Sequence, residues 1–160
     1  MKEQKMNVMR LLDQKKIPYK KHSYSCGGEP PDGVTVASLL GEPPGKVFKT
    51  LVCQGADKAW LVFVIPADKE LDLKKAARAS GEKSVALIHV KELLPLTGYV
   101  RGGCSPIGMK KLFPTFFDRS AEHQETVLVS AGKIGLQTEL SPQDLARLTQ
   151  GVFADLTKDA

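Results

Sequence analysis

Apolar residues recur at helical spacing near the start of the chain and again in several later segments. Between residues 3 and 16 they fall on one face of a helix, and Pro18 limits its continuation. The segment 72–80 lies between Asp72, a capping residue, and Gly81, a left-handed stop, which predicts a second helix. The other predicted helices cover residues 34–40, 88–94 and 142–148.

Shorter segments rich in β-branched and aromatic residues lie between these helices and predict strands. Residues 46–53 and 59–66 are apolar at most positions and are separated by a polar turn around Gly55, which predicts a hairpin buried on both faces. The segment 85–94 is ambiguous between strand and helix, and we favour a helix over 88–94. Further strands are predicted at 19–24, 113–118, 126–129, 136–140 and 152–156, with a turn over 131–135.

Strands outnumber helices in this pattern, and many of them are joined by turns of hairpin length. Such an order favours an α+β fold over a doubly wound parallel sheet. The chain has 160 residues, of which 42% are hydrophobic, so it can bury a core without disulfides or a metal. We therefore expect a single domain over residues 1–160, with a mixed, strongly bent central β-sheet flanked by helices.

Charge and cysteine content narrow the class of the protein further. An excess of 23 basic over 18 acidic residues leaves a net charge of +5, which favours an anionic partner without naming one. The three cysteines are odd in number and lack C-x-x-C spacing, as is typical of a reducing compartment. No apolar run approaches the roughly 18 residues of a membrane span, and the N-terminus lacks the apolar segment of a signal peptide. We expect a cytoplasmic protein that does not bind a membrane.

A glycine-rich loop over residues 97–108, T-G-Y-V-R-G-G-C-S-P-I-G, is the strongest sign of a binding site. Glycine costs chain entropy, so four glycines in this loop indicate backbone N–H groups that reach a ligand. Pro106 fixes its own φ and pushes Ser105 toward an extended conformation, which stiffens the second half. An ordinary connection between two elements explains the composition equally well. The nucleophile elbow of an α/β hydrolase is excluded, because Ile107 stands where a second glycine is required.

Lys49 is the second informative residue, because it lies within an apolar predicted strand. On that strand it shares a face with Val47, Leu51 and Cys53. Burying an ammonium group without partners is costly. The lysine therefore either reaches solvent at the end of the strand or lies in a cleft where it binds an anion or a carbonyl group.

Most familiar catalytic groups are missing from the sequence. The three histidines lie in separate predicted elements, and no set of residues has the spacing of a metal site, so we expect neither a metal nor a cofactor. Gly132 and Lys133 lack the flanking residues of an ATP-binding loop, and no base lies near Cys104 in the sequence. A lysine, a threonine and backbone amides remain, and these could polarise an activated ester without an attacking group from the protein.

Four motifs along the chain resemble those of the YbaK/EbsC family of aminoacyl-tRNA deacylases. They are V-F-K-T-L-V at 47–52, D-L-K-K-A-A at 72–77, the glycine-rich loop at 97–108 and V-S-A-G-K-I-G-L at 129–136. The family is related to the editing domain inserted into bacterial prolyl-tRNA synthetases, so the resemblance implies a mixed sheet and an enzyme that hydrolyses mischarged tRNA. For the YbaK branch, it implies cysteinyl-tRNA(Pro) as the main substrate.

The resemblance also assigns site residues by their positions in the motifs. Lys49 corresponds to the family's essential lysine, and Gly102 and Gly103 belong to the loop whose backbone N–H groups face the scissile carbonyl group. Gln137 stands where the YbaK branch has an aspartate, so the pocket loses a charge. The other residues implied to bind substrate are Tyr24, Thr50, Cys104, Ser105, Pro106 and Ser130.

The resemblance suggests a route in which the thiol of the attached cysteine attacks its own ester, while the protein orients it and polarises the carbonyl group. Lys49 contacts either that carbonyl group or the phosphate of the terminal adenosine. The expected partners are the acceptor end of aminoacyl-tRNA and prolyl-tRNA synthetase. An alternative, favoured by Gln137, is a non-catalytic module of the same fold that binds tRNA ends or a synthetase. A hydrolase that uses Cys104 or Ser105 as its nucleophile is a third class.

Overall fold

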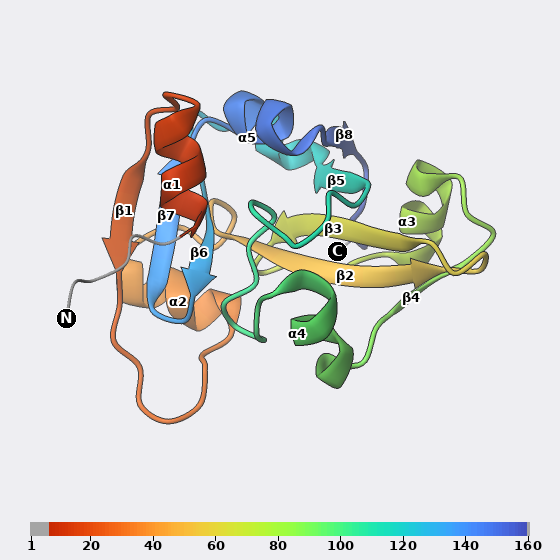
Figure 1. Ribbon diagram of the computed structural model, residues 1–160, viewed down its shortest axis with the longest axis horizontal. Helices are drawn as coiled ribbons and strands as arrows, with labels where there is room; N and C mark the ends of the chain where they lie inside the picture. Colours follow the sequence, from red (N-terminus) through yellow and green to blue (C-terminus); the bar gives the residue numbers. More distant parts are fainter. Residues whose placement is uncertain (1–6, 160) are drawn as a thin grey trace.

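The computed structural model describes residues 7–159, which form two sheets surrounded by short helices (Figure 1). The strands are β1 (Lys20–Ser23), β2 (Phe48–Gly55), β3 (Trp60–Pro66), β4 (Val85–Leu87), β5 (Thr115–Asp118), β6 (Val127–Lys133), β7 (Leu136–Leu140) and β8 (Val152–Ala154). The helices are α1 (Asn7–Gln14), α2 (Gly33–Leu40), α3 (Leu73–Ser80), α4 (Val90–Thr97), α5 (Pro142–Thr149) and the short 3-10 helix η1 (Arg119–His123).

The larger sheet contains five of the described strands, in the order β4-β2-β3-β5-β8. It is mixed, because β2 pairs antiparallel with β3 and β4, while β5 pairs parallel with β3 and β8. The smaller sheet has the order β1-β7-β6 and is antiparallel throughout. The expected α+β class and the mixed sheet are confirmed. The bend that we expected within one sheet takes the form of a junction between two.

The two sheets meet just before β2. Val47 forms a parallel bridge with Leu128 of β6, and the Leu128 N–H donates to the carbonyl oxygen of Lys46 at 3.0 Å. On the other side, the Ala67 N–H donates to the carbonyl oxygen of Val47 at 2.8 Å. The start of β2 is therefore fixed to both sheets, and Lys49 follows it directly.

Three helices cover the sheets and form the core with them. The side chain of Val129 belongs to the same buried cluster as α1, whereas Leu128 packs with Val36 of α2. Because successive residues of a strand point to opposite faces, α1 and α2 cover opposite faces of β6. α3 packs on the large sheet, where Ala76 and Ala77 belong to the same buried cluster as one face of β3. The hairpin strand β3 is buried on both faces, as predicted, whereas its partner β2 is only partly buried at Lys49, Thr50, Leu51 and Gln54.

The predicted helix ends are confirmed where capping residues mark them. The carboxylate of Asp72 accepts hydrogen bonds from the N–H groups of Lys74 and Lys75 at 3.0 and 3.1 Å. Gly81 ends α3 with a φ of 76°, in the left-handed region that glycine adopts without strain. Ser141 likewise caps α5, which begins with a proline.

Two segments differ from the prediction. Residues 85–94, for which we favoured a helix from residue 88, begin with the strand β4, and the helix follows as α4. The strand forms because residues 85–87 pair with residues 53–55 of β2, a long-range contact that local sequence does not reveal. The turn predicted over 131–135 is shorter, because β6 continues through an irregularity as far as Lys133.

The first predicted helix is confirmed as α1, which occupies the middle of the segment 3–16. Residues 3–6 of that segment lie outside the described part of the chain. Across residues 7–159, no helix combines the length and the hydropathy needed to span a bilayer.

Candidate functional site

A small cavity lies beside the start of β2, next to the junction of the two sheets. Its volume is about 110 Å³, and segments far apart in the sequence line it. Six of the expected site residues contribute to its wall, so the fold brings the lysine, the glycine-rich loop and the S-A-G-K motif together. The lining residues are Lys49, Thr50, Gly102, Cys104, Ser130 and Gln137, with Pro31, Gly33, Val36, Val47 and Phe48.

Lys49 supplies the only cation among these lining residues. It is half-buried, and its ammonium group forms no hydrogen bond or salt bridge within residues 7–159. The nearby carboxylate of Asp32 is engaged elsewhere. A hydrogen bond from the Thr35 N–H lowers the pKa of Asp32, and the charge of Lys49 adds a smaller contribution. The sequence left open whether this lysine reaches solvent at the end of the strand or lies in a cleft. In the structure Lys49 lies in the cavity wall, where its ammonium group is available to a ligand.

Two polar atoms in the cavity wall are buried without a hydrogen-bond partner. They are Oγ1 of Thr50 and Oε1 of Gln137. A buried polar atom without a partner costs roughly 1–3 kcal/mol, so native proteins rarely leave one. The third polar side chain of the wall is satisfied, because Oγ of Ser130 accepts from the Gly132 N–H at 3.1 Å. Two unpartnered atoms in one cavity indicate a site that a polar ligand completes.

The glycine-rich loop reaches the cavity through a tight turn. The Gly103 N–H donates to the carbonyl oxygen of Val100 at 3.0 Å, and Gly102 has a φ of 86°, as the third position of a type II turn requires. An added Cβ at Gly102 would lie 2.6 Å from Cβ of Pro30, so glycine also permits this contact. The N–H groups of Gly102 and Cys104 donate no hydrogen bond within residues 7–159. Both are therefore available to an oxygen atom of a ligand.

Gly103 and Ser105, two further expected site residues, lie outside the cavity wall. Gly103 packs against the turn between β6 and β7, where an added Cβ would lie 3.1 Å from the backbone nitrogen of Ile134. Its N–H is already bonded within the turn, so the expected role of Gly103 as an oxyanion donor is not supported. Ser105 is fully buried, and its Oγ accepts from the Ile107 N–H at 3.2 Å. That hydroxyl group stabilises the loop instead of facing the cavity.

Pro106 and Tyr24 also lie away from Lys49. Pro106 borders a separate cavity of about 260 Å³ between α1 and α5. Tyr24 follows β1, where its N–H donates to the carbonyl oxygen of Gly135 at 3.0 Å and its ring packs against the α2 cluster. Neither residue is among those that line the cavity, so their expected contact with substrate stays a prediction.

Sequence reasoning missed the part of the wall formed by the start of α2. Pro31, Gly33 and Val36 line the cavity there, and none of them is among the expected site residues. At Gly33 an added Cβ would lie 2.7 Å from Cβ of Ala67, so glycine lets α2 approach the end of β3. The available signal was a glycine directly after Asp32, which caps the helix.

Cys104 lines the cavity but has the properties of a packed thiol. It is 8% exposed, and burial raises the pKa of its thiol from 9.0 to about 12, against a smaller opposing effect of a hydrogen bond with Thr97. Burial likewise raises the pKa of the Cys53 thiol to about 12. Because the thiolate is the reactive form, Cys104 is a poor nucleophile.

We expect that only Cys26 is alkylated in the folded protein, because it is exposed while the other two cysteines are buried. Treatment with iodoacetamide at pH 8 and mass spectrometry should show one label before unfolding and all three cysteines labelled after it. A Cys26→Ser variant should stay unlabelled while folded. Labelling of Cys104 in that folded variant would contradict the prediction and would restore a thiol nucleophile as a candidate.

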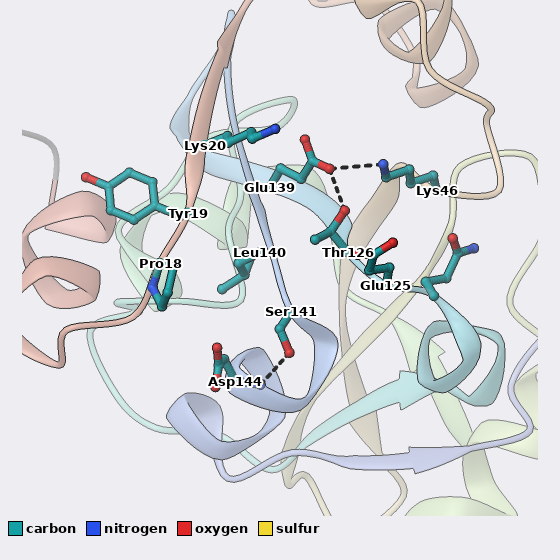
Figure 2. A pocket seen from close by; sticks show the side chains of 11 residues that line it. Pro18, Tyr19, Lys20, Lys46, Glu125, Thr126, Glu139, Leu140, Ser141 and Asp144 are labelled. Carbon is teal, nitrogen blue, oxygen red and sulfur yellow. Dashed lines mark hydrogen bonds and ion pairs between the residues drawn. The ribbon is translucent and has the colours of Figure 1, made fainter.

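A larger cavity of about 630 Å³ lies between β1, β7 and the start of α5 (Figure 2). Glu139 lies at its wall and is paired with Lys46 at 3.0 Å, with His22 at 2.8 Å and with the Thr126 hydroxyl group. Burial raises the pKa of Glu139, but hydrogen bonds from these three side chains outweigh it and lower the pKa to about 2. Because these groups satisfy one another, we favour the smaller cavity, whose polar atoms lack partners.

The smaller cavity is therefore lined by a cation, by two residues whose N–H groups are free within residues 7–159, and by two unpartnered polar atoms, but by no activated nucleophile. Within residues 7–159, no group of three or more His, Cys, Asp or Glu side chains is arranged to hold a metal ion. Such a set of groups can bind and polarise a carbonyl group. The attacking atom would then come from the substrate or from water.

Comparison with known proteins identifies the family. A model of the aminoacyl-tRNA editing domain matches residues 31–148, which is more than half of the chain. The chain belongs to the aminoacyl-tRNA editing family. A relative from Enterococcus faecalis, provisionally named Cys-tRNA(Pro)/Cys-tRNA(Cys) deacylase EbsC, is 48% identical over 155 residues, which are 97% of this chain and 94% of the relative. The expected family and the enzyme class, an aminoacyl-tRNA deacylase, are thereby confirmed.

Two further proteins match in part or in fold alone. A proline–tRNA ligase of Thermosipho africanus is 31% identical over 77 residues, which are 48% of this chain and 14% of the ligase. A solved structure of a provisionally assigned trans-editing enzyme for prolyl-tRNA synthetase matches with a TM-score of 0.83 and 23% identity, covering 98% of this chain and 100% of the other. The latter match confirms the fold of the editing domain.

Proposed function

We propose that the protein removes a small amino acid from mischarged tRNA at the Lys49 cavity, with Cys-tRNA(Pro) as its preferred substrate. The observation that carries this proposal is the convergence of an unpaired ammonium group, two free backbone N–H groups and two unpartnered polar atoms on one cavity. The name of the Enterococcus faecalis relative supports the choice of the cysteinyl group.

The size of the cavity limits what can enter it. Its volume of about 110 Å³ is well below the ~300–1,000 Å³ of pockets that enclose drug-sized ligands. A small aminoacyl group such as cysteinyl is therefore a better fit than an aromatic or long basic one. Val36, Val47 and Phe48 supply the apolar part of the wall, which suits a thiol or a methyl group.

The cavity would activate the ester by binding the charge that develops on its carbonyl oxygen. In the simplest arrangement, the N–H groups of Gly102 and Cys104 donate to that oxygen, and the ammonium group of Lys49 stabilises the oxyanion. A single donor of this kind typically contributes about 10²–10³-fold in rate. This sparse set is sufficient for an ester that is already activated.

The attacking atom would be the sulfur of the substrate's own cysteinyl group. A bond forms between this sulfur and the carbonyl carbon, the carbon–oxygen bond to the ribose breaks, and the thiol proton passes to the departing ribose oxygen. Water then hydrolyses the resulting thiolactone to free cysteine. Holding sulfur and carbon in a near-attack geometry can lower the barrier by several kcal/mol, so no nucleophile of the protein is needed.

Gln137 and Thr50 would hold the amino-acid end of the substrate. Oε1 of Gln137 can only accept a hydrogen bond, so it suits the ammonium group of the attached amino acid, and the Thr50 hydroxyl group can either donate or accept. Placing a donor on each atom would remove the cost of leaving it unpaired. The neutral amide thus keeps a binding role at a position where the YbaK branch has a carboxylate.

Prolyl-tRNA synthetase is the proposed partner of this reaction. The cavity holds only the aminoacyl end, so identification of tRNA(Pro) requires either contacts outside it or a synthetase that supplies the tRNA. The similarity of this chain to a segment of proline–tRNA ligases supports the second route.

A panel of misacylated tRNAs tests the proposed function. We expect release of cysteine from Cys-tRNA(Pro) well above the uncatalysed rate, weaker release of other small amino acids, and none of phenylalanine. The S-methylated analogue of Cys-tRNA(Pro), which has no free thiol, should not be released by the substrate-assisted route. Absence of release from every tRNA, together with measurable tRNA binding, would replace the enzyme with a non-catalytic binding module.

A further inference from the structure

Two exposed cations lie close in sequence to residues of the Lys49 cavity wall, on two segments that touch each other. Arg101 precedes Gly102, which lines the cavity, and Lys133 lies three residues after Ser130, which also lines it. The turns are in contact, since an added Cβ at Gly103 would lie 3.3 Å from Cα of Lys133. In Figure 1 the loop that leaves α4 passes beside the end of β6. Two segments about thirty residues apart thus place positive charge at one rim.

Neither cation has a hydrogen bond or salt bridge within residues 7–159. Some other cations do have partners, as Lys75 has Asp155 and Lys158 has Glu70, whereas the exposed Lys74 and Arg78 of α3 also have none within residues 7–159. The acidic residues closest in sequence to the cavity wall are Glu29, Asp32 and Glu139. None of them forms a salt bridge with Arg101 or Lys133, and Glu139 pairs with Lys46 and His22 instead. Two neighbouring cations without counter-charges form a site of positive potential that an anion stabilises.

The size of the cavity indicates which anion would lie there. At about 110 Å³ the cavity has room for an aminoacyl group but not for the nucleotide that carries it. The terminal adenosine would therefore remain at the mouth. Its 5′-phosphate is separated from the aminoacyl ester only by the ribose, so a phosphate lies close to the rim whenever the ester lies inside.

We propose that Arg101 and Lys133 form a phosphate-binding site at the cavity mouth, which holds the last internucleotide phosphates of the tRNA acceptor strand. The planar guanidinium group of Arg101 can bind a phosphate with two hydrogen bonds, and Lys133 adds a mobile point charge. The proposal rests on the proposed function, because it takes the end of tRNA as the ligand. The proposal also separates phosphate binding from carbonyl binding. If Arg101 and Lys133 bind the phosphates, the Lys49 ammonium group is free to bind the ester carbonyl group.

A double variant, Arg101→Ala with Lys133→Ala, tests this site. For Cys-tRNA(Pro) we expect KM to rise about tenfold or more with kcat nearly unchanged, because the lost contacts bind substrate and transition state alike. The slope of log affinity for uncharged tRNA against log salt should fall by about 1.4, or about 0.7 for each lost contact to single-stranded phosphate. Hydrolysis of cysteinyl-adenosine, which has no phosphate, should be unaffected.

A matched control is the double variant Lys74→Ala with Arg78→Ala, which also removes one lysine and one arginine. Both are exposed on α3, which packs on the large sheet away from the β6–β7 turn (Figure 1). An equal loss of tRNA affinity in both double variants, or an unchanged salt slope in the first, would overturn the phosphate site. A wild-type protein that binds tRNA with the expected slope but releases no amino acid would instead contradict the proposed function and leave the site standing.

Discussion

Lys49→Ala is expected to lower kcat/KM for deacylation of Cys-tRNA(Pro) by about 100-fold or more while leaving the protein folded. The loss is large because the ammonium group is the only cation in the cavity wall and would stabilise charge in the transition state. Stability should change by no more than about 0.5 kcal/mol, since the ammonium group has no partner among residues 7–159. Single-turnover deacylation assays and urea unfolding of the same preparations measure the two effects.

Two further substitutions separate charge from shape at this position. Lys49→Met keeps most of the side-chain stem without the charge and should be as inactive as Lys49→Ala. Lys49→Arg keeps the charge on a planar group of different geometry, so it should recover only part of the activity. A Lys49→Met variant with the wild-type rate would show that the charge takes no part in the reaction.

The kinetic pattern of these variants also distinguishes the two roles considered for Lys49. A contact with the carbonyl oxygen strengthens as charge develops, so its loss lowers kcat and kcat/KM equally. A contact with the phosphate of the terminal adenosine is the same before and during the reaction, so its loss raises KM alone. The phosphate site proposed at Arg101 and Lys133 favours the first pattern.

Local signals in the sequence predicted most of the elements and some of the cavity wall. Asp72 and Gly81 fix the ends of α3 because capping depends on residues next to each other in the chain. Lys49 stood out in the sequence because burying an ammonium group in an apolar strand costs free energy unless it binds a partner. In each case the physical cause acts within a few residues, where it can be read directly.

The rest depends on contacts between distant segments. The strand β4 exists because residues 85–87 pair with β2, and the two sheets meet where Val47 bridges Leu128. The tight turn from Val100 likewise uses the Gly103 N–H, a pairing that the glycine-rich composition does not reveal. Such pairings decide which amides stay free, and sequence patterns do not contain them.

Glu139→Gln is expected to destabilise the protein by about 3 kcal/mol at neutral pH, the difference between an ordinary pKa of 4.5 and about 2 in the folded state. A carboxyl group with a lowered pKa contributes stability that is complete above its unfolded pKa and is lost as the pH falls through its folded pKa. The difference between wild type and variant should therefore be constant above about pH 5.5 and shrink to roughly 1 kcal/mol near pH 3. Urea unfolding at a series of pH values measures it.

The expected effect is large because Glu139 joins three segments and its side chain is mostly buried. Its side chain is 11% exposed, and it binds Lys46 just before β2 and Thr126 before β6 (Figure 2). It also binds His22 of β1. A matched control is Glu70→Gln, because Glu70 pairs with Lys158 at 3.2 Å but is 76% exposed. That exposed pair should contribute at most about 1 kcal/mol. If the loss in Glu139→Gln stayed the same from pH 7 to pH 3, the carboxylate of Glu139 would not be the group that links folding to pH.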